Sequence, residues 1–213
     1  MADKKKVSIA VIKRLPRYYR FLKDLLNADI LRISSNELSE KMDITASQVR
    51  QDLNCFGGFG QQGYGYNVEQ LYNEIGNILG SNKGYKAIII GAGNMGQALA
   101  NYSNFPKRGY NIIAVFDSNP NVVGKKIRDM TVLHVDGMEN YVKENKVDIA
   151  ILTVPSESTQ QVAEKAANAG IRALWNFSAI DLKLSQDVVV ENVHLSDSLM
   201  ILGYRLKDFA EIE

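Results

Sequence analysis

The stretch YKAIIIGAGNMG at residues 85–96 decides the fold of the second half of the chain. A short apolar run predicts a buried strand, and it leads directly into a Gly-x-Gly-x-x-Gly motif and a helix-forming segment. In this context Gly91 makes the tight turn, Gly93 lets the backbone approach a pyrophosphate, and Gly96 lets the helix pack closely on the strand. The helix N-terminus attracts the anion. The predicted dinucleotide-binding loop comprises Gly91, Ala92, Gly93, Asn94, Met95 and Gly96.

An acidic residue stands where such a fold places its ribose ligand. Asp117 ends the next predicted strand, about 20 residues beyond the glycine motif. A carboxylate there accepts hydrogen bonds from the adenosine ribose hydroxyls and repels the extra phosphate of NADP, so we expect NADH or NAD⁺ as the cofactor. The alternative is a glycine turn that only packs against its helix, with Asp117 capping a turn before Pro120.

Apolar runs alternate with helical segments through the rest of this region. Strands are predicted at residues 85–90, 112–116, 131–135, 149–154 and 173–177. Strands separated by helices form a parallel sheet with helices on its faces. We therefore expect an α/β, Rossmann-like dinucleotide-binding domain at residues 84–193.

The N-terminal region has the periodicity of helices. Pro16 suits the first turn of a helix, whose apolar positions follow at residues 18–26. Two capping patterns come next, and they predict helices at residues 35–42 and 46–54 with the lengths and separation of a helix-turn-helix. The two patterns are Ser34 with Glu37 and Thr45 with Gln48.

The second helix of this pair is the candidate for contact with the DNA major groove. If Ala46, Val49 and Leu53 face the core, the helical period leaves a polar face outside, with Gln and Arg side chains suited to base edges and phosphates. The outward residues are Ser47, Gln48, Arg50, Gln51 and Asn54. The alternative is an ordinary solvated helix face.

A glycine-rich and aromatic segment, FGGFGQQGYGY at residues 56–66, follows the helix pair. It predicts a short β-ribbon that turns near Gln61, Gln62 and Gly63, which with the helix pair makes a winged-helix domain at residues 1–83. Gln61 and Gln62 are the candidate wing contacts, although they bring no positive charge to the tip. A glycine-aromatic loop without DNA contact is the alternative.

Charge separates the two regions. Residues 1–83 carry 12 Lys or Arg against 9 Asp or Glu, a net charge of +3, whereas residues 84–213 carry 13 against 15, a net charge of −2. The excess is concentrated in the first 20 residues, and such a field attracts a polyanion. The basic residues there are Lys4, Lys5, Lys6, Lys13, Arg14, Arg17 and Arg20. A solubilising basic arm is the alternative.

The residues that carry enzyme chemistry are scarce. Neither His134 nor His194 has a partner acid or lysine at a recognisable spacing, and two histidines with one cysteine provide no metal-ligand cluster. We expect no catalytic and no metal site, and we expect Cys55 to be a small buried apolar residue rather than a thiol sensor. A small NAD-dependent oxidoreductase with a DNA-binding-like N-terminal module is the competing function.

The composition also bears on location. The longest apolar runs fall far short of the ~20 residues needed to span a bilayer. The polar, basic N-terminus has no apolar signal core behind it, and a single cysteine cannot form an internal disulfide. We therefore expect a cytoplasmic protein with no membrane contact.

The C-terminal segment, residues 194–213, carries an apolar stripe at spacings of four and three residues. Its members are Leu195, Leu199, Leu202, Leu206 and Phe209. A symmetric DNA reader needs a dimer, so we expect a homodimer that exchanges this helix between subunits. Packing on its own sheet is the alternative.

Over essentially its whole length the chain resembles the Rex family of redox-sensing transcriptional repressors. The matching motifs include Arg14-Leu15-Pro16, Gln48 to Leu53, Gly91 to Gly96, Phe116-Asp117, Thr153-Val154-Pro155 and Asn176-Phe177. The resemblance implies a homodimer with exchanged C-terminal helices. Its winged helices would bind a palindromic double-stranded operator when the NADH/NAD⁺ ratio is low, and NADH would release the operator.

The resemblance also assigns roles to single residues. Arg50 and Gln51 match recognition-helix contacts, Arg14 an N-terminal DNA contact and Tyr102 a nicotinamide-side sensing tyrosine. Thr153, Val154 and Pro155 join the cofactor site, and Arg20 matches an arginine that pairs across the domains. This chain departs from the family in having Gln51 for a common lysine, Gln61-Gln62 for a basic wing and His194 for a common aspartate.

Overall fold

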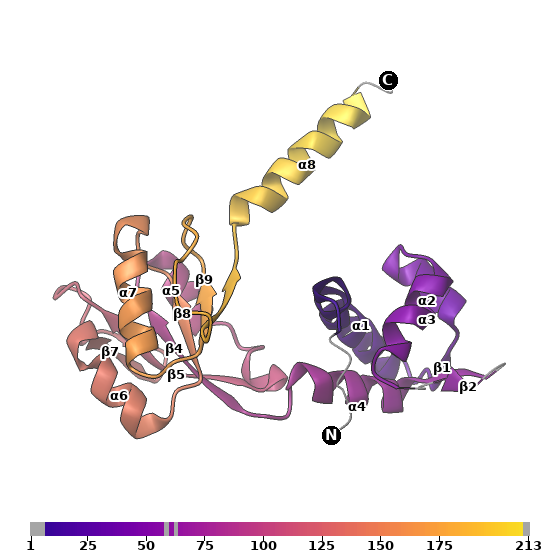
Figure 1. Ribbon diagram of the computed structural model, residues 1–213, viewed down its shortest axis with the longest axis horizontal. Helices are drawn as coiled ribbons and strands as arrows, with labels where there is room; N and C mark the ends of the chain where they lie inside the picture. The colour runs from indigo at the N-terminus through magenta and orange to yellow at the C-terminus, as the bar shows by residue number, and fades with distance from the viewer. Residues whose placement is uncertain (1–6, 58–59, 62–63, 211–213) are drawn as a thin grey trace. The chain divides into compact units, whose positions relative to one another are not determined.

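The computed structural model describes residues 7–57, 60–61 and 64–210, and the chain divides into two compact units, Met1–Asn82 and Lys83–Glu213 (Figure 1). The first unit is mainly helical and the second contains a large sheet. Each unit encloses hydrophobic cores of its own.

The first unit has the helix and strand order of a winged helix. A small antiparallel sheet with strand order β1-β3-β2 lies beside the helices. Its elements are α1 (Ile9–Asn27), β1 (Arg32–Ile33), α2 (Ser35–Met42), α3 (Ala46–Asn54), β2 (Gly60–Gln61), β3 (Gly65–Asn67) and α4 (Val68–Leu79). The predicted helix-turn-helix and ribbon are confirmed. Strand β1 was not predicted, because two residues are too few to show a period.

The placement of Pro16 in a first helical turn is wrong. Helix α1 begins at Ile9, where the Ser8 hydroxyl accepts a hydrogen bond from the Val11 amide at 3.3 Å, and Pro16 lies inside the helix. The buried residues of α1 start at Val11 and continue beyond Pro16 to Leu25. Burial of this continuous stripe offsets the hydrogen bond that proline removes.

The two predicted capping boxes differ. Ser34 and Glu37 form the full reciprocal pair, with Glu37 N donating to Ser34 Oγ at 3.2 Å and Ser34 N donating to Glu37 Oε2 at 2.7 Å. Thr45 Oγ1 accepts from Gln48 N at 3.1 Å, but the Gln48 side chain donates to Asp52 instead of returning to the cap. The second box is therefore only half formed.

The second unit is a seven-stranded sheet of strand order β10-β9-β8-β4-β5-β7-β6, parallel except for the edge pair β6-β7. Its strands are β4 (Tyr85–Ile90), β5 (Tyr110–Asp117), β6 (Lys126–Ile127), β7 (Met130–His134), β8 (Ile149–Leu152), β9 (Ala173–Asn176) and β10 (Val189–Asn192). All five predicted strands are confirmed, with ends shifted by up to two residues. Edge strands β6 and β10 were missed because β6 is two residues long and β10 is mostly exposed.

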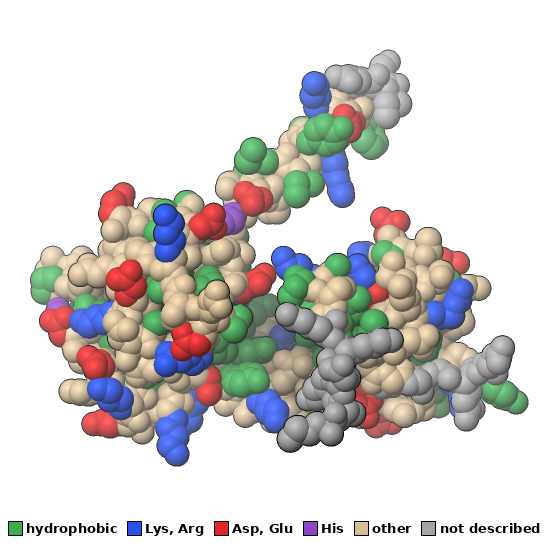
Figure 2. All heavy atoms as spheres, in the orientation of Figure 1, with side chains coloured by type: hydrophobic (Ala, Val, Ile, Leu, Met, Phe, Trp, Pro, Cys, Tyr) green, Lys and Arg blue, Asp and Glu red, His purple; other side chains and the backbone are tan. Residues whose placement is uncertain are grey.

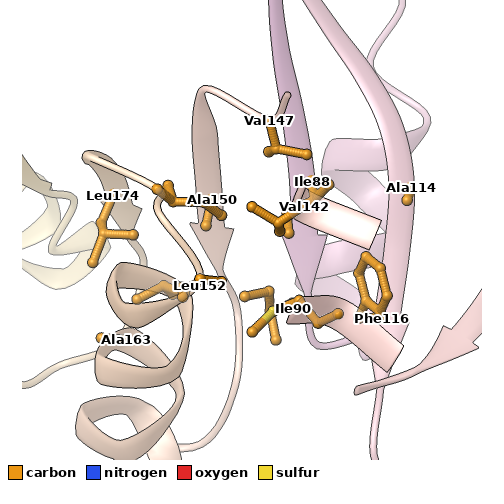
Figure 3. Close-up of a cluster of buried hydrophobic side chains, with 14 of the residues drawn as sticks. Ile88, Ile90, Ala114, Phe116, Val142, Val147, Ala150, Leu152, Ala163 and Leu174 are labelled. Atoms are coloured by element: carbon orange, nitrogen blue, oxygen red, sulfur yellow. The ribbon is translucent and has the colours of Figure 1, made fainter. Parts of the chain in front are cut away.

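Helices cover both faces of this sheet (Figure 1). They are α5 (Asn94–Ala100), α6 (Met138–Asn145) and α7 (Ser156–Asn168), with short 3-10 turns at Pro106–Arg108 and Val135–Gly137. The last helix, α8 (Leu195–Ala210), follows β10 and is exposed along its length. Ile88 and Ile90 of β4 pack toward Val142 of α6 and Ala163 of α7 (Figure 3). The alternate residue Ile89 faces the α5 side, so β4 is buried on both faces.

Candidate cofactor cleft and nucleic-acid interface

Two glycines of the loop after β4 are required by packing. Gly91 has a φ of +104°, and a Cβ there would lie 2.6 Å from the carbonyl oxygen of Thr153. At Gly96 a Cβ would lie only 1.9 Å from the carbonyl oxygen of Gly91. The backbone at Gly91 and Gly96 therefore lies too close to neighbouring carbonyl oxygens for a side chain at either position.

Gly93 lies in a different environment. A Cβ built on it meets no atom within 4 Å, so packing inside the protein does not explain a glycine at this position. Gly93 is the N-cap of α5 and offers no side chain to the first amide groups of that helix. An open glycine beside uncapped amides fits the close approach of an anionic ligand.

Asp117, at the carboxyl end of β5, lies directly beside this loop. Its Oδ2 accepts a hydrogen bond from the Ala92 amide at 2.6 Å, and its Oδ1 accepts from the Asn119 amide at 2.8 Å. Each carboxylate oxygen can accept a further bond. The side chain is therefore oriented by the backbone while it retains capacity for ligand hydroxyls.

A cavity of about 550 Å³ opens between the loops that follow β4, β5 and β8. Strand β4 lies between β8 and β5, so the cavity is outside the carboxyl ends of the strands where the chain order reverses. Its lining residues are Ile90, Gly91, Ala92, Gly93, Asp117, Ser118, Asn119, Val122, Val135, Thr153, Val154, Pro155, Ser158 and Val162.

Seven of the predicted cofactor residues line this cavity, namely Gly91, Ala92, Gly93, Asp117, Thr153, Val154 and Pro155. Sequence reasoning missed Ser118, Asn119 and Ser158, which supply polar groups to the same space. Their position just after the ends of two strands was the available signal, because that edge of a parallel sheet forms ligand sites.

The other predicted cofactor residues lie elsewhere. Asn94, Met95 and Gly96 begin α5 without lining the cavity, and Tyr102 lines a second cavity of about 240 Å³ with Arg128. Tyr102 is 47% exposed, and its ring stands edge-on to that of Phe105 with 4.8 Å between centroids. This chain alone does not bring Tyr102 into the cleft beside Asp117.

In the winged-helix unit, α3 has most of its predicted orientation. Val49 and Leu53 are buried, whereas Ser47, Arg50 and Gln51 are exposed. Arg50 Nη1 donates to the hydroxyl of Ser35 on α2 at 2.9 Å. Because this hydroxyl is neutral, it does not offset the positive charge of Arg50 on the outer face. Gln48 and Ala46 are only half-exposed.

Asp52 is a buried residue of α3 that sequence reasoning missed. Its carboxylate is 0% exposed and accepts bonds from Arg14 Nε at 2.6 Å, Arg14 Nη2 at 2.7 Å, Gln48 Nε2 at 2.7 Å and Tyr18 Oη at 3.1 Å. Burial raises the pKa of Asp52, but the Arg14, Gln48 and Tyr18 hydrogen bonds with the Arg14 charge outweigh it and lower the pKa below 3.8. The spacing of Gln48 and Asp52 by four residues was the only sequence signal for part of this network.

Arg14, which the resemblance assigns as an N-terminal DNA contact, pairs with Asp52 in this structure. Its side chain is 28% exposed, and two of its nitrogens are directed at the buried carboxylate of Asp52. The same holds in part for Gln48, whose amide nitrogen is used by Asp52. Gln48 was expected to point outward, but a buried charge that must be compensated draws its amide group inward.

The wing hairpin pairs Gly60 with Tyr66 and Gln61 with Gly65. The predicted contact Gln62 lies outside the described residues, as does the side chain of Gln61. Arg32 of β1 supplies a cation beside this hairpin. Its guanidinium lies 6.0 Å from the centroid of the Tyr64 ring, and Nη1 donates to the Tyr64 carbonyl at 3.3 Å. Sequence reasoning missed it because β1 was not predicted.

The expectation that Cys55 is buried is wrong. The residue is exposed at the C-cap of α3, with Sγ 3.3 Å from the carbonyl oxygen of Gln51. The core-facing stripe of α3 ends at Leu53. Within the described part of the chain, no group of three His, Cys, Asp or Glu residues is arranged to hold a metal ion.

The apolar stripe of α8 is exposed along its length, which contradicts packing on its own sheet. Its members range from 54% exposed at Leu195 to 75% at Phe209, and hydrophobic side chains are visible along α8 in Figure 2. Met200 and Tyr204, on the opposite side of the helix by its period, are also exposed. In the residues that the structure describes, no helix is long and apolar enough to cross a membrane.

Comparison with known proteins covers both units. A family model described as "CoA binding domain" matches residues 82–180, and one described as "Putative DNA-binding protein N-terminus" matches residues 6–54. The redox-sensing transcriptional repressor Rex of Thermoanaerobacter pseudethanolicus is 59% identical over 98% of this chain and 93% of its own length. That of Clostridium botulinum is 57% identical over 95% of this chain and 96% of its own length.

Solved structures agree with these relatives. The crystal structure of RSP in complex with beta-NAD⁺ and operator DNA has a TM-score of 0.91 and 58% identity, covering 97% of this chain and 95% of that one. RSP in complex with beta-NADH has a TM-score of 0.90 and 54% identity, covering 98% and 100%. RSP is described as a Rex-family repressor.

Proposed function

The chain belongs to the Rex family of redox-sensing transcriptional repressors, and we infer that it represses transcription by binding operator DNA and that NADH releases it. One observation carries this function. The chain combines a winged-helix unit with a second unit that contains the cofactor cleft, and 97% of the chain matches a repressor solved with operator DNA and NAD⁺. NADH and NAD⁺ act as sensed ligands.

The cleft residues suit a dinucleotide. We propose that the pyrophosphate lies over Gly93, where the open space leaves room for it, and that Asp117 accepts hydrogen bonds from the adenosine ribose. Thr153, Val154 and Pro155 would form the opposite wall of the cavity. We assign Tyr102 the sensing of the nicotinamide, since it follows the helix that begins at the glycine loop.

The DNA interface is proposed to centre on the outer face of α3. Ser47, Arg50 and Gln51 are exposed there, and Arg and Gln can bond guanine and adenine edges in the major groove. Gln61 and Gln62 are retained as proposed wing contacts. Arg32, beside the wing, would supply the positive charge toward phosphates that the wing tip lacks.

A palindromic operator requires two copies of the reader. We propose a homodimer in which residues 194–213 are the dimerisation segment, because the apolar stripe of α8 finds no cover on its own sheet. We place domain boundaries near residues 83 and 193. A repressor acts where the chromosomal DNA is, so we propose a cytoplasmic location.

An oxidoreductase is not favoured. The curated relatives are transcriptional repressors, so the chain is not an enzyme. His134 lies 3.3 Å from Asp136 and His194 lies 4.0 Å from Asp181, and neither histidine lines the dinucleotide cavity.

A mobility-shift titration tests the function directly. The probe is a palindromic duplex selected from random sequence by the unaltered protein, with a scrambled duplex as control. We expect NADH to release the palindrome at concentrations where NAD⁺ does not. Release by neither nucleotide, or turnover of NADH by the purified protein, would contradict the proposal.

A further inference from the structure

We propose that Asp52 is a positioning residue for DNA recognition: it fixes Arg14 and Gln48 on the inner side of α3 and neutralises the charge of Arg14. This inference rests on the proposed function, because it takes α3 as the helix that enters the operator. It predicts that Arg14, although basic and close to α3, contributes to specificity without contributing a phosphate contact.

The hydrogen bonds of Asp52 join two helices. Oδ2 accepts from Arg14 Nε at 2.6 Å and from Tyr18 Oη at 3.1 Å, both on α1, whereas Oδ1 accepts from Arg14 Nη2 at 2.7 Å and from Gln48 Nε2 at 2.7 Å. The four donors surround a side chain with no exposed surface. The carboxylate therefore fixes the direction of α3 relative to α1.

The charges explain why Asp52 needs these partners and why the group as a whole is neutral. A buried carboxylate is costly unless an opposite charge and hydrogen bonds compensate it, and a bidentate arginine does so with defined geometry through two parallel hydrogen bonds. Burial, followed by the Asp52 charge, raises the pKa of Tyr18, so the Tyr18 hydroxyl stays protonated and donates. The pair of Arg14 and Asp52 is neutral as a unit, so it adds little to the field that DNA phosphates experience.

Asp52 also holds the side chain of Gln48. Bidentate recognition of adenine needs the amide nitrogen and the amide oxygen of one Gln side chain together. In Gln48 the nitrogen is directed at Asp52, whereas Gln51 lies exposed one turn along the outer face. Of the two glutamines, Gln51 is therefore the base reader and Gln48 is part of the support beneath it.

Salt dependence separates this role from direct contact. Binding to DNA weakens with salt with a slope of about −0.9 in log affinity against log salt for each phosphate that is neutralised. The full-length unaltered protein and Arg14→Gln are titrated with the selected palindrome and its scrambled duplex across salt. We expect Arg14→Gln to lower affinity for the palindrome severalfold and to leave the slope on the scrambled duplex unchanged.

The Asp52→Asn variant, which removes the other partner of the pair, should change the salt slope on the scrambled duplex. Asp52→Asn removes the negative charge and offers an amide to some of the same donors, which frees Arg14 toward phosphates. We expect tighter binding of the scrambled duplex, a slope steeper by about 0.9, and a smaller preference for the palindrome. Glu40→Gln is the matched control, because it removes one negative charge from an exposed position on α2, and its slope should stay that of the unaltered protein.

The outcomes are distinguishable. A slope shallower by about 0.9 in Arg14→Gln would show that Arg14 contacts phosphate and would overturn the proposal. Parallel loss of both affinities in Asp52→Asn would reduce Asp52 to a structural residue and also overturn it. If Asp52→Asn does not fold, as monitored by circular dichroism, Arg14→Gln decides alone.

Failure of the unaltered protein to prefer the palindrome contradicts the proposed function instead, since the slopes on scrambled DNA are measured independently.

Discussion

The carboxylate of Asp117 accepts a hydrogen bond from the backbone amide of Ala92 at 2.6 Å, across the gap between the ends of two neighbouring strands. The bond joins the residue proposed to bind ribose to the loop proposed to bind pyrophosphate. It fixes the carboxylate at the edge of the 550 Å³ cavity. The two halves of the cofactor site are thus oriented toward each other by the protein backbone.

Asp117→Ala should weaken NADH binding and reduce the preference of the protein for NADH over NADPH. The variant loses charge-assisted hydrogen bonds, worth about 1.5–3 kcal/mol each, and it loses the repulsion of the 2′-phosphate. Calorimetric titration of both nucleotides into the unaltered protein and the variant measures the change. Equal affinity of the unaltered protein for NADH and NADPH would remove Asp117 from the ribose site.

The glycines of the loop should respond differently to a side chain. Gly93→Val should abolish dinucleotide binding without changing the thermal midpoint, because the side chain enters the open space expected for the pyrophosphate. Gly96→Ala should lower the thermal midpoint, because its Cβ would lie 1.9 Å from the Gly91 carbonyl oxygen. Gly137→Ala, with free space and a φ of −80°, is the harmless control. Undiminished NADH binding in Gly93→Val would place the pyrophosphate elsewhere.

Arg50→Ala should weaken binding of the selected palindrome by ~1–3 kcal/mol if Arg50 reads a base, or reduce the salt slope by about 1 if it contacts phosphate. NADH affinity should not change, because Arg50 lies on the winged-helix unit. Mobility-shift titrations across salt distinguish the two cases. An unaltered affinity and slope would exclude α3 as the recognition helix.

The pH dependence of stability should reveal the Asp52 network. Because the pKa of Asp52 is lower in the folded protein than its ordinary 3.8, the folded state favours the ionised form. This contribution is present above pH 3.8 and is lost as the pH falls through the lower, folded value. Denaturant unfolding should therefore show the gap in stability between the unaltered protein and Asp52→Asn shrinking below about pH 4. A gap that does not depend on pH would mean that Asp52 is not ionised in the fold.

Local patterns were sufficient for the parallel sheet and for the cofactor loop. Gly91, Gly93 and Gly96 follow an apolar strand, and the strand, the turn and the helix all depend on residues close in sequence. Asp117 could be added because the distance from the motif to the next strand end is set by one helix and one strand.

Contacts between distant residues were beyond sequence reasoning. Arg14 and Asp52 are 38 residues apart, and only the packing of α1 against α3 brings them together. Arg32 reaches the wing because the short strand β1 pairs with β3. The burial of a stripe that runs from Val11 to Leu25, on both sides of the exposed Pro16, also depends on tertiary packing, which overrides the local preference of proline.

The most direct test of the account is the affinity for NADH with and without the selected palindrome, measured by calorimetry on the full-length protein. Coupling between two sites is reciprocal, so DNA must weaken NADH binding by the same factor by which NADH weakens DNA binding, typically ~5–150-fold. We predict equal factors from the two titrations. NADH affinity that is the same with and without the palindrome would contradict the account, because the nucleotide then could not release the protein from DNA.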